Sequence, residues 1–424
     1  MHSEFTPLLW THQTNIYEVN LRQYTEEGTF NAFAKHLPRL KDMGVEVLWF
    51  MPIYPIGLKN RKGILGSYYS IRDYQAVNPD HGTFRDFHSL ANTAHQMGFR
   101  IMLDWVANHT SWDHVWTETN PDFFRRDEHG NFTPPYPEWG DVIKLDYDNG
   151  EMRQAMIDAM KFWVKEFDID GYRCDMAHLV PLDFWNEART QVDRIKPLFW
   201  LAETEEINYH QVFDASYTWE FLHTMERFWR RETNIAGLDA VLNKYREQFP
   251  EKSFRIYFSS NHDENSHSGS EYQRMGDAAK AFAVLCATWN GIPLIYGGQE
   301  LPNLKALKFF EKDCVEWSSD VQLHEFYKKL LTLKTNNPAL RAADVKASTQ
   351  RIKTSADDKI FSFLRKNAND EVLVVINLSP GSFQFSIEIK GRFREIFSNR
   401  VNDFSIDKTL SVEPWQYFVF EKLN

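Results

Sequence analysis

The chain has 424 residues, 43% of them hydrophobic, which is enough to bury a large core and to build more than one domain. Its 59 acidic residues outnumber 48 lysines and arginines and give a formal charge of -11, which argues against nucleic acid and anionic membrane surfaces as partners. The three cysteines, Cys174, Cys286 and Cys314, are isolated, which argues against a disulfide framework and a zinc site.

The sequence shows no membrane-directed segment. No stretch approaches the roughly 20 apolar residues that a membrane-spanning helix needs. The N-terminal segment 1–7 lacks a basic region followed by an apolar one. We therefore expect a cytoplasmic protein, and a secreted chain whose signal peptide was removed is the open alternative. The sequence does not indicate an oligomeric state.

Short apolar runs alternate with helical patterns over the first three quarters of the chain. The runs predict strands at 16–21, 45–51, 99–105, 169–173, 199–202, 214–217, 254–259 and 292–296. Amphipathic patterns predict helices at about 31–43, 83–97, 151–167, 183–195, 238–248 and 277–289. Gly44 is expected to end the first helix, a capping box of Thr83 and Asp86 to begin the second, and Asp183 to cap the fourth. Continuous apolar strands separated by helices indicate a parallel sheet, and eight such units favour a closed (β/α)8 barrel. No glycine-rich phosphate-binding motif follows the first strand.

Two segments depart from this alternation. Residues 110–146 are rich in proline, tryptophan and charge and are too long for an ordinary loop, so they are expected to form an inserted lobe. From about residue 337 short strands and turns predict a C-terminal antiparallel β-sandwich. The predicted organisation is a barrel of residues 1–109 and 147–336, a lobe of residues 110–146 and a C-terminal domain of residues 337–424.

The segment Asp170 to Asp175 carries the first candidate for chemistry. Side chains alternate along a strand, so Arg173 and Asp175 share a face, and Arg173 is expected to hold the Asp175 carboxylate ionised at neutral pH. An ionised and positioned carboxylate can act as a nucleophile toward a sugar carbon. A purely structural ion pair is the alternative for this hexapeptide taken alone.

Polar residues follow several other predicted strands, where the active site of a closed barrel lies. They are Asp104, Asn108 and His109 after the third strand, Glu203 after the fifth, and His262 and Asp263 after the seventh. Three carboxylates at one mouth repel each other unless one is protonated. Glu203 follows the apolar run 199–202, so it is the candidate acid, while Asp175 stays ionised beside Arg173.

The order of these segments resembles the α-amylase family of glycoside hydrolases over nearly the whole chain. The segment from Asp104 to His109 is similar to the family motif D-x-x-x-N-H, and that from Gly171 to Asp175 to G-x-R-x-D. Glu203 is similar to the family's strand-five glutamate, and Asn261-His262-Asp263 to its N-H-D motif. Tyr69 resembles the tyrosine that stacks on the reacting sugar. The lobe and the C-terminal domain resemble the family's domains B and C.

The resemblance implies a retaining mechanism on an α-glucan oligosaccharide. Asp175 would attack the anomeric carbon while Glu203 protonates the departing oxygen and then activates water, with the two carboxyls about 5–5.5 Å apart. Asp263 would bind ring hydroxyls and help to keep Glu203 protonated. His109 and His262 would bind hydroxyls as well, and Asp104 would orient Arg173 or His109. The implied substrates are starch-like oligosaccharides with α-1,4 links, or cyclodextrins.

Two departures from the family pattern bear on binding. Many relatives have Lys-His three and four residues after the nucleophile, where this chain has His178 and Leu179. The family's calcium site uses an asparagine that matches Asn108, but the short lobe shows no clear set of carboxylates for the other ligands. We expect no cofactor and no metal, with a calcium ion as the open alternative.

Several alternatives share the chemistry or the fold. A transglycosylase, or a hydrolase of sucrose, trehalose or α-1,6 links, would use the same carboxylates. A non-catalytic partner of a membrane transporter would be expected to lack part of the carboxylate set and to carry a transmembrane helix, and a sugar-binding module without turnover is a further alternative. This chain has all three carboxylates.

Overall fold

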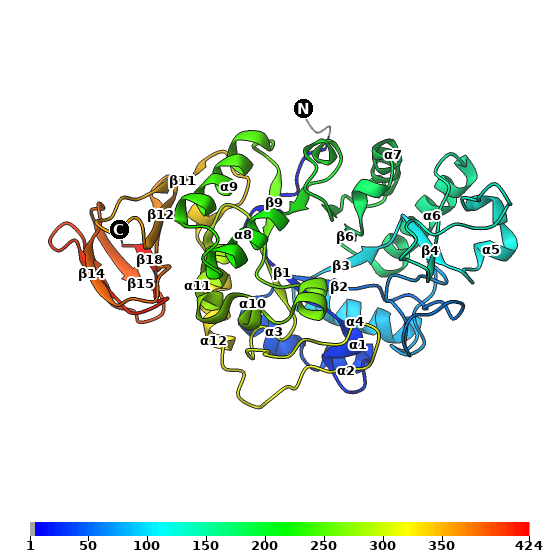
Figure 1. The fold of residues 1–424 in the computed structure, drawn as a ribbon, viewed down its shortest axis with the longest axis horizontal. Helices are drawn as coiled ribbons and strands as arrows, with labels where there is room; N and C mark the ends of the chain where they lie inside the picture. The colour runs from blue at the N-terminus through cyan, green and yellow to red at the C-terminus, as the bar shows by residue number, and fades with distance from the viewer. Residues whose placement is uncertain (1–4, 424) are drawn as a thin grey trace.

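The computed structural model describes residues 5–423, so the first residues of the predicted barrel and of the N-terminal segment lie outside the described part, as does residue 424. Eight parallel strands form a closed barrel in the order β1-β10-β9-β8-β7-β6-β3-β2 (Figure 1). They are β1 (Ile16–Val19), β2 (Val47–Phe50), β3 (Arg100–Trp105), β6 (Gly171–Cys174), β7 (Phe199–Ala202), β8 (Ala215–Tyr217), β9 (Phe254–Tyr257) and β10 (Ile292–Tyr296). The predicted (β/α)8 barrel is confirmed.

The barrel closes at its first strand. In β1, Ile16 pairs with Leu294 of β10 on one side and with Val47 of β2 on the other. All four residues of β1 are buried, Glu18 among them. Closure therefore places one carboxylate inside the barrel next to residues that follow much later in the sequence.

Helices surround the barrel (Figure 1). They are α1 (Leu21–Tyr24), α2 (Phe30–Ala34), α3 (Leu37–Met43), α4 (Phe84–Gln96), α6 (Gly150–Phe167), α7 (Leu182–Val192), α8 (Trp219–Trp229), α9 (Ile235–Gln248), α10 (Glu271–Met275), α11 (Ala279–Thr288) and α12 (His324–Asn336). The sequence did not predict α8 or α12. Both are amphipathic and bury an apolar face, so the periodic signal was present in the sequence.

Local signals decide where the helices begin and end. Thr83 and Asp86 form the expected capping box of α4, and Gly44 ends α3 with φ 89°. The single helix expected at 31–43 is instead two helices. Pro38 lies in the first turn of α3, where its missing N–H leaves no hydrogen bond unmade.

The expected cap at Asp183 is wrong. Pro181 occupies the N-cap position of α7, and no side chain caps that helix. Asp183 lies inside the first turn, and its carboxylate is 2.8 Å from the Arg153 guanidinium of α6. A carboxylate in the first turn still suits the helix dipole, which is why sequence alone favoured a cap there.

The segment between β3 and β6 forms a small lobe at the opposite end of the molecule from the C-terminal domain (Figure 1). It contains β4 (His109–Ser111), α5 (Trp116–Thr119), the 3-10 turn η2 (Pro121–Phe123) and β5 (Val142–Lys144). Strands β4 and β5 pair antiparallel, with His109 opposite Lys144. Because β4 follows closely on β3, the lobe is anchored directly beside the barrel mouth.

The C-terminal part is an antiparallel all-β domain, as predicted. Its strands are β11 (Ala347–Arg351), β12 (Ile360–Asn367), β13 (Asp370–Asn377), β14 (Phe383–Ser386), β15 (Arg392–Glu395), β16 (Val401–Asp403), β17 (Thr409–Val412) and β18 (Tyr417–Lys422). One sheet has the order β11-β12-β13-β18-β15-β16, and β14 pairs with β17.

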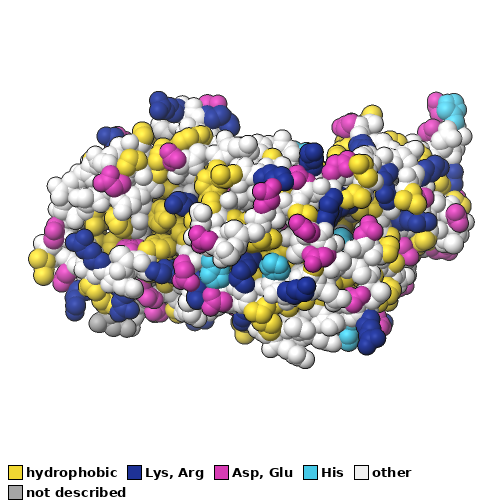
Figure 2. All heavy atoms as spheres, turned by 90° about the horizontal axis from the view of Figure 1, so that it is seen from below, with side chains coloured by type: hydrophobic (Ala, Val, Ile, Leu, Met, Phe, Trp, Pro, Cys, Tyr) yellow, Lys and Arg dark blue, Asp and Glu magenta, His cyan; other side chains and the backbone are white. Residues whose placement is uncertain are grey.

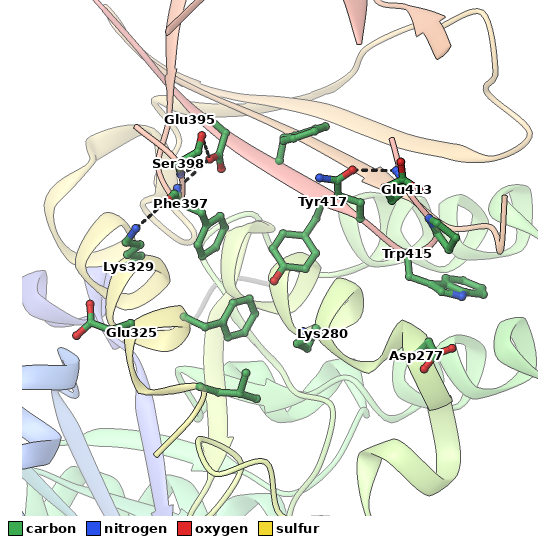
Figure 3. Close-up of a pocket in the computed structure, with 15 residues that line it drawn as sticks. Asp277, Lys280, Glu325, Lys329, Glu395, Phe397, Ser398, Glu413, Trp415 and Tyr417 are labelled. Atoms are coloured by element: carbon green, nitrogen blue, oxygen red, sulfur yellow. Dashed lines mark hydrogen bonds between the residues drawn. The ribbon is translucent and has the colours of Figure 1, made fainter. Parts of the chain in front are cut away.

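Aromatic packing holds this domain on the barrel's helices (Figure 3). The Phe326 ring of α12 stacks on Phe397 with centroids 5.7 Å apart, and Lys329 Nζ donates to the Phe397 carbonyl at 2.7 Å. Tyr417 points into a groove of about 890 Å³ between the two parts. A second cleft lies at the ends of the barrel strands, and none of its lining residues belongs to the C-terminal domain.

The surface carries both signs of charge. Acidic and basic side chains are interspersed over the face seen in Figure 2. Within residues 5–423, no helix combines the length and the apolar character needed to cross a membrane.

Candidate active site

A cleft of about 340 Å³ lies where the barrel strands end. Six of the eight residues that were given a catalytic or binding role line it, namely Tyr69, His109, Asp175, Glu203, His262 and Asp263. The other two, Asp104 and Arg173, are fully buried. The fold therefore brings together side chains from the loop after β2 and from the ends of β3, β6, β7 and β9.

Arg173 connects three carboxyl groups. Its Nη1 lies 3.0 Å from Asp175 Oδ1 and 3.1 Å from Asp104 Oδ1, and its Nη2 lies 2.9 Å from Glu203 Oε1. Strand β6 has β3 and β7 as its neighbours, which is why residues from three strands reach one guanidinium. The predicted pairing of Arg173 with Asp175 is present, and so is that of Asp104 with Arg173.

A backbone hydrogen bond fixes the other oxygen of Glu203. The Met176 N–H donates to Glu203 Oε2 at 2.7 Å, and Met176 has φ 40°, in the left-handed region that side chains rarely adopt. Such backbone strain is concentrated at functional sites. Met176, the residue after Asp175, thus orients the Glu203 carboxyl group.

The buried carboxyl groups bind protons more tightly than exposed ones. Burial raises the pKa of Glu203 to about 7, with Asp175 and Asp263 adding to the rise and Arg173 opposing it. Burial raises the pKa of Asp104 to about 7 in the same way. Of these two, only Glu203 lines the cleft, so it is the group that can exchange a proton with a bound ligand.

Burial also affects the Asp175 carboxyl group. Arg173 does lower the pKa of Asp175, but burial outweighs it, so that the pKa is raised above its ordinary value. Sequence reasoning counted the arginine and not the loss of water around the carboxylate. Arg173 therefore limits a rise in the pKa instead of producing a fall.

A chain of hydrogen bonds crosses the floor of the cleft from Glu18. His262 Nδ1 lies 2.5 Å from Glu18 Oε1, His262 Nε2 lies 2.7 Å from the Tyr69 hydroxyl, and that hydroxyl donates to Asp104 at 3.2 Å. Burial lowers the pKa of His262, but the charges of Asp263 and Glu18 outweigh it and raise the pKa to about 9. His262 is thus a cation at neutral pH and donates from both nitrogens.

His109 is neutral by contrast. Burial lowers its pKa to about 4, and the nearby Asp141 only partly opposes this. Its ring lies 5.5 Å from that of Trp139, centroid to centroid, and both line the cleft. A neutral histidine beside an indole offers a hydrogen-bonding group and an apolar surface, which suits a sugar ring.

The polar side chains around Asn108 and at the base of the lobe contact other side chains of the protein. The Asn108 amide lies 3.1 Å from His109 Nδ1, Asp146 pairs with Arg125 at 3.0 Å, and Asp141 is 3.0 Å from Lys62. These side chains already have partners of their own. Within residues 5–423, the one place where three His, Cys, Asp or Glu ligand atoms gather is the surface group Asp42, His324 and Glu325, outside the lobe.

Several cleft residues were missed by sequence reasoning. They are Glu18 beneath the cleft, and Lys62, Ser67, Asp141, Val142, Met176, His267, Phe309 and Phe310 in its walls. Glu18 had a signal, because a carboxylate in a buried apolar strand needs a partner. The others lie in loops or next to motifs, where no periodicity marks them.

A closed β/α barrel with a buried guanidinium and carboxyl groups of raised pKa at its mouth defines the class: a barrel enzyme that works by carboxyl chemistry.

Comparison with known proteins places the chain within that class. Residues 12–134 and 136–315 match the α-amylase catalytic domain, and residues 352–416 match the α-amylase C-terminal all-beta domain. The chain therefore belongs to the α-amylase family of glycoside hydrolases.

Relatives agree with this placement. The α-amylase MalA of Haloarcula japonica is 30% identical over 386 residues, covering 87% of this chain and 56% of the relative. The structure of a maltogenic α-amylase from Thermotoga neapolitana has a TM-score of 0.89 at 28% identity, covering 97% of this chain and 99% of the other. An α-amylase from Lactobacillus plantarum has a TM-score of 0.88 at 31% identity, with coverages of 98% and 100%. The chain spans 56% to 64% of the length of the first curated relatives it matches.

The charge on His262 can be tested directly. Because Glu18 stabilises the imidazolium, Glu18→Gln should lower the pKa of His262 from about 9. NMR of isotope-labelled histidine across a pH series would measure the titration. His114, whose pKa burial lowers to about 3, gives an internal control that stays neutral. A wild-type His262 that titrates at the ordinary value of about 6.5 would contradict the assignment.

Proposed function

We propose that this protein hydrolyses α-1,4-glucosidic bonds in starch-like oligosaccharides or cyclodextrins with retention of anomeric configuration. The observation that carries the proposal is that one buried guanidinium contacts both Asp175 and Glu203 at the edge of the cleft. A shared guanidinium keeps the two carboxyls close together, which favours direct attack by one of them over attack by an interposed water.

In the first step, an Asp175 oxygen bonds to the anomeric carbon as the bond from that carbon to the glycosidic oxygen breaks. Glu203 gives its proton to the departing oxygen. A pKa of about 7 means that a large share of Glu203 is protonated at neutral pH and can serve as the acid. The product of this step is a covalent glycosyl ester on Asp175 and a free sugar chain.

In the second step, Glu203 has lost its proton and acts as the base. It takes a proton from a water molecule, whose oxygen bonds to the anomeric carbon while the Asp175 ester bond breaks. Two inversions at the same carbon give net retention. Glu203 ends protonated and Asp175 ionised beside Arg173, which restores the starting state.

The groups around the two carboxyls fit a neutral, hydroxyl-rich ring. Tyr69 offers an aromatic face, and the cationic His262 and the neutral His109 offer hydrogen bonds to hydroxyls. Asp263, whose side chain is 37% exposed, can accept from ring hydroxyls. The name of the Thermotoga neapolitana relative, a maltogenic α-amylase, points to a substrate of the same kind.

Proton NMR of fresh products from maltopentaose tests the mechanism. The α-anomer should appear first, and Asp175→Asn should lower kcat by at least about 10³-fold because the attacking carboxylate is lost. Asp168→Asn is the matched control, since Asp168 ends α6 in a left-handed conformation that asparagine tolerates, away from the cleft. First appearance of the β-anomer would refute retention, and oligosaccharides longer than the substrate would identify a transglycosylase.

The pH profile tests the role of Glu203. A raised pKa means that the acid form of Glu203 is present below about 7 and is lost as the pH rises through it, so kcat/KM should fall on the alkaline side. With oligosaccharides, Glu203→Gln should abolish the alkaline fall in kcat/KM. With maltosyl fluoride, whose leaving group needs no proton, the same variant should still carry out the first step. Equal losses with both substrates would contradict the acid role.

We also propose that activity needs no calcium, because the Asp141 and Asp146 carboxylates of the lobe are paired with basic side chains. Dialysis against EDTA should leave both kcat and the melting temperature unchanged. Loss of either, with recovery on adding calcium chloride and not magnesium chloride, would show that a calcium site forms after all.

A further inference from the structure

A loop covers one end of the cleft. We call residues 57–66, in the connection after β2, the cover loop. The Leu65 N–H donates to the Phe310 carbonyl at 3.0 Å, and Arg22 donates to the Gly66 carbonyl at 2.9 Å and to the Phe309 carbonyl at 3.3 Å. The cover loop is thus fastened to the connection after β10, and together the two connections form a wall.

The tip of the cover loop packs tightly against this second connection. Gly63 has φ 64°, and a Cβ atom there would lie 2.5 Å from the Phe310 Cβ. Only a glycine permits both the turn and the close approach. The wall is therefore closed on the side of Phe310.

Lys62 spans the remaining gap, between the cover loop and the lobe. Its Nζ lies 3.0 Å from Asp141 Oδ1 and donates to the Glu138 carbonyl at 2.8 Å. Asp141 is buried, and Lys62, Asp141 and Trp139 all line the cleft. The lysine side chain thus lies where a sugar chain would have to pass between the barrel and the lobe.

The barrel order tells which end of the cleft is closed. The connections after β2 and β10 meet beside β1, because β1 pairs with both strands. Glu203 follows β7, which lies four strands from β1 in either direction around the barrel. The wall and the proposed acid are therefore on opposite sides of the mouth.

The chemistry of glycosidic bond cleavage indicates on which side of the cleft each part of the substrate lies. Glu203 protonates the departing oxygen, so the part of the substrate that leaves lies on the side of β7. In an α-1,4 chain, the residues before the reacting sugar are attached at its C4, across the ring from the anomeric carbon. They extend away from Glu203, toward the side of β1, where the wall stands.

We propose that Lys62, held by Asp141, closes the non-reducing side of the cleft and so limits cleavage to a short fixed distance from the non-reducing end of the glucan. The inference rests on the proposed function and adds to it the direction of attack and the residue that sets product length. Lys62 acts by occupying the gap, and Asp141 acts by holding the lysine there.

The experiment uses maltoheptaose with a p-nitrophenyl group at its reducing end. Products from the reducing end carry this label, and products from the non-reducing end do not. Chromatography of the earliest products should show one short unlabelled oligosaccharide from the wild type. In the variants Lys62→Ala and Asp141→Asn, the ratio of longer unlabelled products to the short unlabelled oligosaccharide should rise by about tenfold. A few contacts in a binding site give substrate discrimination of this size. Lys59→Ala is the matched control, since Lys59 is exposed on the same loop and does not line the cleft.

The outcomes separate the two proposals. A wild type that cleaves the substrate at many positions from the start overturns the role of Lys62 and leaves α-1,4 hydrolysis standing. The role of Lys62 is also overturned, and α-1,4 hydrolysis left standing, if both variants give the same products as the wild type. Their melting temperatures must show that they are folded. A wild type that leaves the substrate intact refutes the proposed function and, with it, this inference.

Discussion

A single buried guanidinium, that of Arg173, is the shared partner of three carboxyl groups at the site. It contacts Asp104, Asp175 and Glu203, which come from three adjacent strands. Losing one partner of a buried ion pair costs about 3–5 kcal/mol, because the remaining charge has neither water nor a counterion. One cation cannot balance three carboxylates, and this excess of negative charge in a dry environment is what keeps a proton available near neutral pH.

The sequence predicted the fold because the barrel is made of strands buried on both faces. Each reads as a continuous apolar run, and the polar residues that end these runs converge by geometry. That is why Asp175, Glu203 and Asp263 could be placed at one mouth from the amino-acid sequence alone. Helix boundaries were less certain where two signals competed, as at Pro38, where a proline inside an amphipathic pattern divided one helix into two.

The rest of the site could not be predicted, because it depends on contacts between residues far apart in the sequence. Glu18 and His262 are 244 positions apart, and only the closed barrel brings them within 2.5 Å. Lys62 and Phe310 lie in connections without periodicity, so no pattern indicates that they wall the cleft. The sequence also does not show that Asp175 is buried. Burial raises the pKa of Asp175, whereas Arg173 alone would lower it.

The pairing of β1 with β10 has a consequence for the protein as it is made. Strand β1 is synthesised almost 280 residues before its partner Leu294 in β10. Until then one edge of β1 stays unpaired and Glu18 has no histidine beside it. An unpaired strand edge can pair with other chains, so shielding of this edge by a chaperone would matter in the interval before β10 is made and not afterwards.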